Sequence, residues 1–128
     1  MGGGIKTHKD LDAWREAMAL AKAVYDWTQR FPKEEVYGLT AQLRRAAVSV
    51  PCNIAEGAAR GSKKEFAQFL FVALGSLSET ETLVLLAQEL LSCDGSDILG
   101  RIERLRKMLI GLIKSVRGSR EGRLTHAS

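Results

Sequence analysis

The sequence predicts an all-α protein, an antiparallel four-helix bundle with up-down-up-down topology. Two observations lead to this prediction. Apolar residues recur at alternating spacings of three and four along four segments, and short polar or glycine-containing stretches separate those segments. Spacings of three and four place side chains on one face of a helix. Helices of similar length joined by short connections pack as antiparallel neighbours.

The first helix is expected between Asp10 and Arg30. Asp10 is the predicted N-cap, and residues 31–32 (FP) end the helix because proline disfavours the helical conformation in the residue before it. The apolar stripe of this helix consists of Leu11, Trp14, Met18, Ala21, Tyr25 and Thr28. We expect this stripe to face the core.

The second helix is expected over residues 40–60. Its stripe consists of Leu39, Leu43, Ala46, Val50 and Ile54. Pro51 lies within the helix, where it removes a backbone donor and crowds the carbonyl of Ala47. Because the stripe continues past Pro51, the sequence predicts a kink there and not a break.

The third helix opens at a predicted capping box, in which Ser62 caps the amide of Glu65. Its stripe runs Phe66, Leu70, Ala73, Leu77, Thr80, Val84, Ala87 and Leu91. Residues 93–96 (CDGS) form a turn, and a fourth stripe follows with Ile98, Ile102, Leu105, Leu109, Leu112 and Val116. The expected organisation is a flexible N-terminus over residues 1–8, the bundle over residues 9–117, and a basic flexible tail over residues 118–128.

The third helix carries more apolar residues than one bundle face can bury. Outside its stripe lie Phe69, Phe71, Val72, Leu74, Leu83, Leu85, Leu86 and Leu90. A helix that is apolar nearly all round must be covered on more than one side. The sequence therefore predicts self-association. No uncharged apolar run approaches the roughly 18 residues of a membrane span and the start lacks a secretory signal, so we expect a cytoplasmic protein with no membrane contact.

The charge of the chain is unevenly distributed. Residues 1–100 hold 11 Lys and Arg against 13 Asp and Glu, whereas residues 101–128 hold 8 against 2. Basic side chains neutralise phosphates without sequence preference, which makes this segment the candidate for weak nucleic-acid binding. The alternative is that these residues only solvate an exposed helix face. The residues concerned are Arg101, Arg104, Arg106, Lys107, Lys114, Arg117, Arg120 and Arg123.

A second polar set falls on or near helix faces that otherwise pack. It consists of Arg44, Arg45, Asn53, Glu56, Arg60 and Glu79. One reading is a ligand or catalytic cluster. The other, which we favour, is a hydrogen-bonded network that fixes helix register or subunit geometry, because charges in bundles are usually satisfied locally. Glu56 and Arg60 are spaced to meet one turn apart.

Metal and catalytic chemistry have little support in the sequence. His8 and His126 lie near the two ends, and no Glu-x-x-His pair of the kind used by di-iron bundles occurs. Neither Cys52 nor Cys93 has a histidine nearby in sequence, so buried, inert thiols are expected. The sequence therefore predicts no metal, no cofactor and no enzymatic activity.

Several segments together form a more specific pattern. They read DLDAW over residues 10–14, YGLT over 37–40, QLRRAAVSVP over 42–51, NIAEG over 53–57 and GSLSE over 75–79. In order and content they resemble the four-helix bundles of the 23S ribosomal RNA intervening-sequence protein family, over about residues 9–117. The resemblance implies a ring-like homo-oligomer, a pentamer, with no established enzymatic activity. It also implies kinship with the accessory variability determinant of diversity-generating retroelements, a more basic bundle that associates with nucleic acid and a reverse transcriptase.

These expectations combine into one working hypothesis. The chain is a non-enzymatic, homo-oligomeric helical bundle that acts as a scaffold or as an accessory factor associated with RNA or DNA. The alternative is a purely structural module whose partner is another protein and which binds no nucleic acid.

Overall fold

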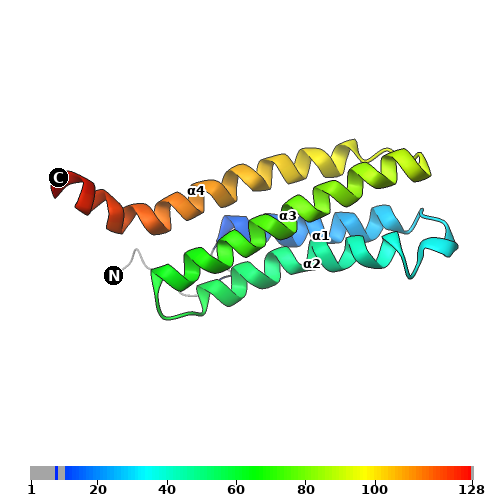
Figure 1. Cartoon of the computed structure of the whole chain (residues 1–128). Helices are drawn as coiled ribbons and strands as arrows, with labels where there is room; N and C mark the ends of the chain where they lie inside the picture. The colour runs from blue at the N-terminus through cyan, green and yellow to red at the C-terminus, as the bar shows by residue number, and fades with distance from the viewer. Residues whose placement is uncertain (1–7, 9–10, 128) are drawn as a thin grey trace.

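A computed structural model describes residue 8 and residues 11–127, with side chains as far as residue 118. Four α-helices follow one another: α1 (Asp12–Thr28), α2 (Leu39–Ala58), α3 (Lys63–Leu91) and α4 (Ser96–Ala127), with a short 3-10 helix, η2 (Lys33–Glu35), between the first two (Figure 1). No strand occurs in this described part of the chain. The predicted all-α, four-helix fold is confirmed.

The four helices form a ring of neighbours. Contacts join α1 to α2, α2 to α3, α3 to α4, and α4 back to α1. In Figure 1 the chain runs one way along α1 and α3 and the other way along α2 and α4. The α1 and α3 helices therefore occupy diagonal corners of the bundle.

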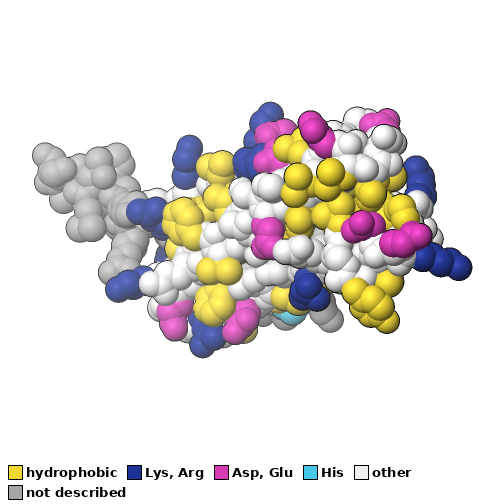
Figure 2. All heavy atoms as spheres, turned by 45° about the vertical axis from the view of Figure 1, so that its right-hand side comes forward, with side chains coloured by type: hydrophobic (Ala, Val, Ile, Leu, Met, Phe, Trp, Pro, Cys, Tyr) yellow, Lys and Arg dark blue, Asp and Glu magenta, His cyan; other side chains and the backbone are white. Residues whose placement is uncertain are grey.

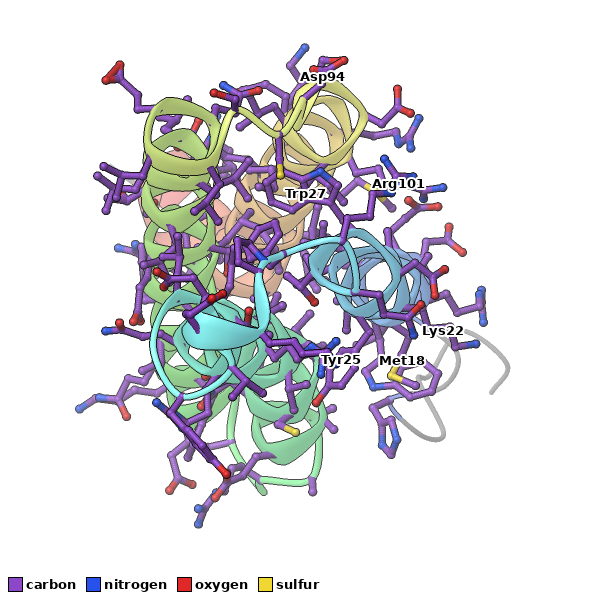
Figure 3. All side chains as sticks on the ribbon, turned by 90° about the vertical axis from the view of Figure 1, so that its right-hand side faces the viewer. Met18, Lys22, Tyr25, Trp27, Asp94 and Arg101 are labelled. Atoms are coloured by element: carbon purple, nitrogen blue, oxygen red, sulfur yellow. The ribbon has the colours of Figure 1, made fainter. Side chains whose placement is uncertain are left out.

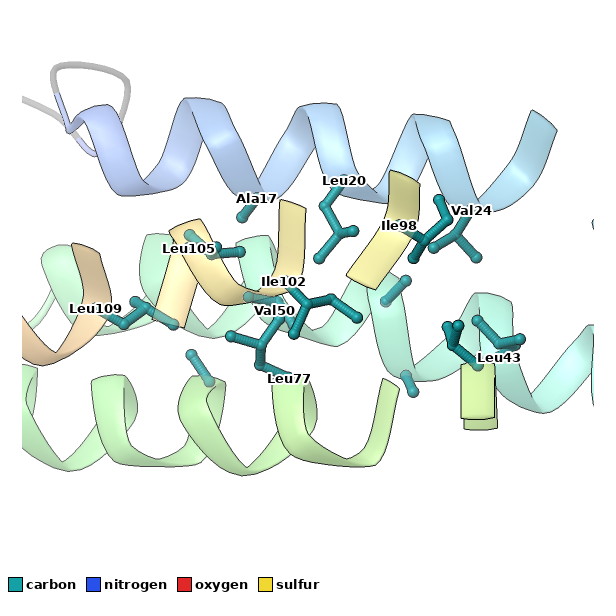
Figure 4. Close-up of a cluster of buried hydrophobic side chains, with 14 of the residues drawn as sticks. Ala17, Leu20, Val24, Leu43, Val50, Leu77, Ile98, Ile102, Leu105 and Leu109 are labelled. Atoms are coloured by element: carbon teal, nitrogen blue, oxygen red, sulfur yellow. The ribbon is translucent and has the colours of Figure 1, made fainter. Parts of the chain in front are cut away.

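The core lies along the bundle axis and receives side chains from all four helices. Figure 4 shows Leu20 of α1, Val50 of α2, Leu77 of α3 and Ile102 of α4 meeting in one layer. All four side chains are fully buried. Burying an aliphatic side chain of this size contributes about 1.5–3 kcal/mol each, so such layers dominate the stability of the fold.

The buried face of α1 differs from the predicted stripe. The side chains of Trp14 and Met18 are only half-buried, and Tyr25 is 42% exposed. The face that packs inward consists of Ala13, Ala17, Leu20, Ala21, Val24, Trp27 and Thr28. The prediction that the stripe faces the core is therefore wrong for Met18 and Tyr25, whereas Trp14 is half-buried and packs against the core.

The α2 and α3 helices approach each other through small residues. Ser49 and Ser76 hydrogen-bond through their hydroxyl groups at 2.8 Å. Near the end of α2, a Cβ atom at Gly57 would lie 2.6 Å from the Cβ of Phe69 and 3.2 Å from the backbone oxygen of Phe66. Only glycine fits this contact.

The α2 helix continues through Pro51, whose ring is buried. Its predicted stripe is confirmed, since Leu43, Ala46, Val50 and Ile54 are buried. No break occurs at the proline, and the kink stays a prediction.

The ends of α3 are fixed by side-chain and backbone contacts. The hydroxyl of Ser62 accepts a hydrogen bond from the amide of Glu65 at 3.1 Å, which confirms the predicted cap. At the other end Ser92 takes a left-handed conformation, with φ at 56°. The indole N–H of Trp27 then donates to the backbone oxygen of Asp94 at 3.0 Å and ties the α3–α4 connection to α1.

The α4 helix is longer than the sequence suggested. It runs to Ala127, past residue 118 where the apolar pattern ends. Arg, Glu and Leu all favour helix, and the glycines at 118 and 122 cost only about 1 kcal/mol each relative to alanine, which weakens a helix without ending it. Ile113 is buried, whereas the predicted core residues Leu112 and Val116 are half-buried.

The α3 helix is long and apolar enough, by length and composition alone, to cross a membrane. The sequence analysis considered only uncharged apolar runs. It did not identify α3 as long and apolar enough because the apolar stretch of this helix contains acidic residues. The core helix of a bundle passes the same test, and α3 contributes Leu70, Leu77 and Val84 to the core. However, only 33% of its most apolar stretch is buried.

Replacement of Gly57 tests the close approach of α2 and α3. We expect Gly57→Ala to lower the free energy of unfolding by about 1–3 kcal/mol, because the new methyl group forces the two backbones apart. Gly111→Ala is the matched control, since an added Cβ at that α4 position meets nothing within 4 Å. It should raise stability by about 0.5–1 kcal/mol through helix propensity alone. Equal effects of the two changes in urea denaturation would contradict this account.

Candidate functional site

Arg44 connects α2 to the end of α1. Its Nε donates to the hydroxyl of Thr28 at 2.8 Å, and its guanidinium lies 4.4 Å from the ring centre of Tyr25. A second donor reaches the backbone oxygen of Tyr25 at 3.3 Å. A cation at the C-terminal end of a helix also interacts favourably with the helix dipole. Arg44 therefore has a structural role.

The other members of the polar set lie in separate places. Asn53 donates to the backbone oxygen of Ser49 at 2.8 Å. Glu56 and Arg60 form the expected one-turn ion pair at 3.2 Å, and both are exposed. Arg60 also lies over the ring of Phe69 of α3, and Asn53 also donates to the Ser49 hydroxyl, which hydrogen-bonds to α3. These contacts lie in different places, so the polar set does not converge on one site.

Arg45 and Glu79 complete that set, and both side chains are exposed. Neither has a hydrogen bond or ion pair within the part of the chain that the structure describes. Arg45 lies on α2 and Glu79 on α3. Each presents a free charge at the surface.

The basic residues of α4 face three directions. Arg104 lies 3.6 Å from Glu16 of α1, whereas Arg117 lies over the ring of Phe71 of α3. Lys107 and Lys114 are exposed between these two sides. The side chains of Arg120 and Arg123 fall outside the part whose side chains the structure describes.

Arg106 is engaged within the chain. It pairs with Glu81 of α3 at 2.6 Å and with Glu103 at 2.7 Å. Burial lowers the pKa of the guanidinium, but the hydrogen bonds and charges of Glu81 and Glu103 outweigh this and leave the pKa above its ordinary value. Arg106 therefore stabilises the α3–α4 contact and is not available to a polyanion.

A polar hollow of about 540 Å³ opens at the end of the bundle where α1 meets α4 (Figure 3). Its charged lining consists of Asp26, Arg30, Asp94, Asp97, Arg101 and Arg104. Three acidic and three basic side chains balance one another, so the hollow does not favour a simple anion. Sequence reasoning missed the contribution of Arg30, because that residue is more than 60 positions from its α4 neighbours.

The backbone amide of Ser96 donates to Asp94 at 3.0 Å. This hydrogen bond lowers the pKa of the Asp94 carboxyl below its ordinary value, and the hydroxyl of Ser96 adds to the effect. The Asp94 carboxylate therefore helps to cap the start of α4.

A second hollow is an apolar groove of about 550 Å³ between α1 and α2, which we call the α1–α2 groove. Figure 3 shows Met18, Lys22 and Tyr25 on the α1 side of it. Its lining consists of Trp14, Met18, Ala21, Lys22, Tyr25, Asp26, Val48, Pro51, Cys52 and Ala55. The sequence analysis did not predict the groove because it assigned Met18 and Tyr25 to the core.

The outward side of α3 carries a row of exposed apolar side chains, which we call the α3 face. Figure 2 shows hydrophobic groups gathered in patches between charged side chains on this side of the molecule. Its apolar members, between 44% and 70% exposed, are Phe71, Val72, Leu85, Leu86 and Leu90. Of the eight residues predicted as excess apolar surface on this helix, these five are exposed, whereas Phe69 and Leu74 are half-buried and Leu83 is buried.

The described residues offer no group of three or more His, Cys, Asp or Glu side chains placed to hold a metal ion. Cys93 is half-buried and Cys52 is exposed in the α1–α2 groove, so the expectation of a buried thiol is wrong for Cys52. The arrangement is suited to apolar contact and to weak electrostatic binding.

The neighbouring residues Arg44 and Arg45 provide a matched test of these assignments. Arg44→Ala should lower the free energy of unfolding by about 1–2 kcal/mol, because it removes charged hydrogen bonds that are only partly shielded from water. Arg45→Ala should change it by less than about 0.5 kcal/mol. Chemical denaturation of both variants measures the difference, and a larger loss for Arg45→Ala would refute the assignment.

The cap at Asp94 predicts a pH dependence. A carboxyl whose pKa is lower in the folded state stabilises the protein above the unfolded value of 3.8, and this contribution is lost as the pH falls through the folded value. Wild type should therefore be more stable than Asp94→Asn at neutral pH. The difference should shrink as the pH falls below 3.8 and vanish once the pH lies below the folded pKa, where both side chains are neutral. A difference independent of pH in urea titrations would rule out the charged cap.

Comparison with protein families gives one match. Residues 9–111 match the family described as 23S rRNA-intervening sequence protein. A comparison with curated proteins finds no match. The family match covers all of α1, α2 and α3 and half of α4, and it agrees with the resemblance carried by the segments over residues 10–57. The chain belongs to the 23S rRNA-intervening sequence protein family.

Proposed function

We propose that this protein is a non-enzymatic scaffold that self-associates and binds nucleic acid weakly through α4. The observation that carries the proposal is the separation of two surfaces on one small bundle. The apolar surface is the α3 face, and the basic surface is the outward side of α4, with Lys107 and Lys114 at its centre. An antiparallel bundle with α2 bent at Pro51 is part of this proposal.

Self-association is supported by the energetics of α3. Removing apolar surface from water gains roughly 25 cal/mol per Å², and five large side chains of the α3 face remain exposed in the single subunit. Exposed apolar patches often mark an interaction surface, and here they lie near the two ends of the α3 face, at residues 71–72 and 85–90. A ring of five subunits, as the family resemblance implies, would bury these exposed apolar side chains between neighbouring copies.

Nucleic-acid binding is supported by charge. Of the eight basic residues after position 100, six lie between 101 and 117, and five of these remain when Arg106, which is paired with Glu81 and Glu103, is left out. Phosphate contacts made by Lys and Arg release counterions and give affinity without sequence preference. Assembly multiplies the number of such contacts per particle.

A second candidate function is a protein-interaction module that binds no nucleic acid. The specific observation in its favour is that Arg106 and Arg104 already pair with Glu81 and Glu16, which reduces the free positive charge of α4. In this alternative the α3 face binds another protein. Both candidates are cytoplasmic in our proposal, and neither includes a cofactor or catalysis.

The nucleic-acid proposal is tested by polarisation binding of labelled RNA and DNA across a salt series. The double variant Lys107→Gln/Lys114→Gln should weaken binding uniformly across sequences and lower the slope of log affinity against log salt by about two. Lys33→Gln/Lys64→Gln removes the same charge from η2 and from the start of α3, and is the matched control. Its slope should stay close to that of wild type.

Truncation after Gly118 adds a second comparison. It removes two arginines and one glutamate, so only a minor loss is expected if the bundle part of α4 carries the site. A loss of most binding on truncation would move the site to residues 119–128. Absence of binding by wild type at low salt would reject the nucleic-acid proposal in favour of the protein-interaction module.

A further inference from the structure

We infer that subunits associate head to tail, with the α3 face of one copy packed into the α1–α2 groove of the next. This inference rests on the self-association proposed above and adds the two surfaces and their polarity. The occupant of the groove is thus a second copy of this chain. Three features of the described residues lead to it: shape, charge and position.

The shapes of the two apolar surfaces are complementary. The α1–α2 groove is concave and its lining is mostly apolar, with Met18, Val48 and Pro51 beside the aromatic residues Trp14 and Tyr25. The α3 face lies on the outward side of one helix, which is convex, and its apolar residues gather near the two ends of that side, at residues 71–72 and 85–90. Pairing two grooves about a two-fold axis would leave a void between them, and pairing two α3 faces would leave both grooves exposed. Only the contact of groove with α3 face covers both surfaces in one step.

The charges around the two surfaces are also complementary. Lys22 lies in the groove wall, and Arg45 lies beside Val48 on the neighbouring part of α2. On α3, Glu79 and Glu89 are exposed among the apolar residues. The helix contains no Lys or Arg after Lys64. None of these four charged side chains has an ion pair within the described residues, so each is free for a partner of opposite sign.

The position of the surfaces determines the polarity of assembly. The groove lies between α1 and α2, whereas the α3 face lies on the helix diagonal to α1, so one subunit cannot bring its own two surfaces together. A contact between two unlike surfaces is heterologous and can repeat from copy to copy until it closes. The glutamates on the α3 face argue against a lipid surface as the cover, because charged side chains are costly in hydrocarbon.

Charge insertion and mixing test this inference. Val48→Glu places an acid in the groove, and Leu86→Glu places one in the α3 face; both positions are already partly exposed, at 37% and 44%. Light scattering should report wild type as an oligomer and each variant alone as a single subunit. An equimolar mixture should give a particle of two subunits, one of each kind, because a single intact groove and a single intact α3 face remain to pair.

Ser115→Glu is the matched control, since it adds the same charge at an exposed position of α4, and it should assemble as wild type does. Circular dichroism checks that the variants fold; Cys52→Glu and Leu90→Glu replace any variant that does not. Loss of assembly by Leu86→Glu but not by Val48→Glu would overturn the inference and indicate α3 pairing with α3. Two dissociated variants that fail to pair on mixing would also overturn it. A wild-type protein of one subunit would reject self-association itself.

Discussion

The close contact between α2 and α3 is the constraint on which the rest of the structure depends. Gly57 lets the backbones approach beside Phe66 and Phe69, and the hydroxyls of Ser49 and Ser76 bridge the same interface farther along. This contact fixes the rotation of α3 about its own axis. Once Leu70, Leu77 and Val84 of α3 face the core, the apolar residues on the opposite side of the helix have only the outward direction left. The exposed α3 face is therefore a consequence of how tightly α3 is held, because a looser pair would let the helix turn to bury more of it.

The sequence predicted α2 and α3 well because each has one apolar stripe that is clearly stronger than any alternative. The α1 helix has two. One contains Trp14, Met18 and Tyr25, and the other contains Ala17, Leu20 and Val24. Periodicity shows that a helix has an inward face, but two stripes offset by one position satisfy the same period. Hydrophobicity favours the aromatic stripe, whereas close packing favours the small one, since a helix lined with alanine can approach its neighbours more closely. The choice depends on the shape of the opposing helices, which a single segment does not encode.

The polar contacts fall into two groups: those that local spacing predicts and those that depend on how the helices pack. The Glu56–Arg60 pair and the Ser62–Glu65 cap follow from local spacing, and both were predictable. The contacts of Arg44 with Thr28 and of Arg106 with Glu81 join residues 16 and 25 positions apart and depend on helix rotation. Counting charges therefore overestimated the number of α4 side chains that are free to bind a polyanion, because Arg106 is paired with Glu81 and Glu103. It also missed Arg30, which the end of α1 carries to the start of α4.

Assembly and charge are coupled by this division of surfaces. The α1–α2 groove and the α3 face occupy three helices, so a head-to-tail contact leaves the outward side of α4 uncovered in every copy. A single subunit has few free basic groups on that side, and the phosphate contacts available to it are correspondingly weak. Electrostatic affinity grows with the number of phosphates neutralised. An oligomer in which every copy keeps α4 outward therefore binds a long polyanion more tightly than one subunit does, without any change in α4 itself. The apolar residues of α3 thus affect nucleic-acid binding indirectly, through the number of copies that they hold together.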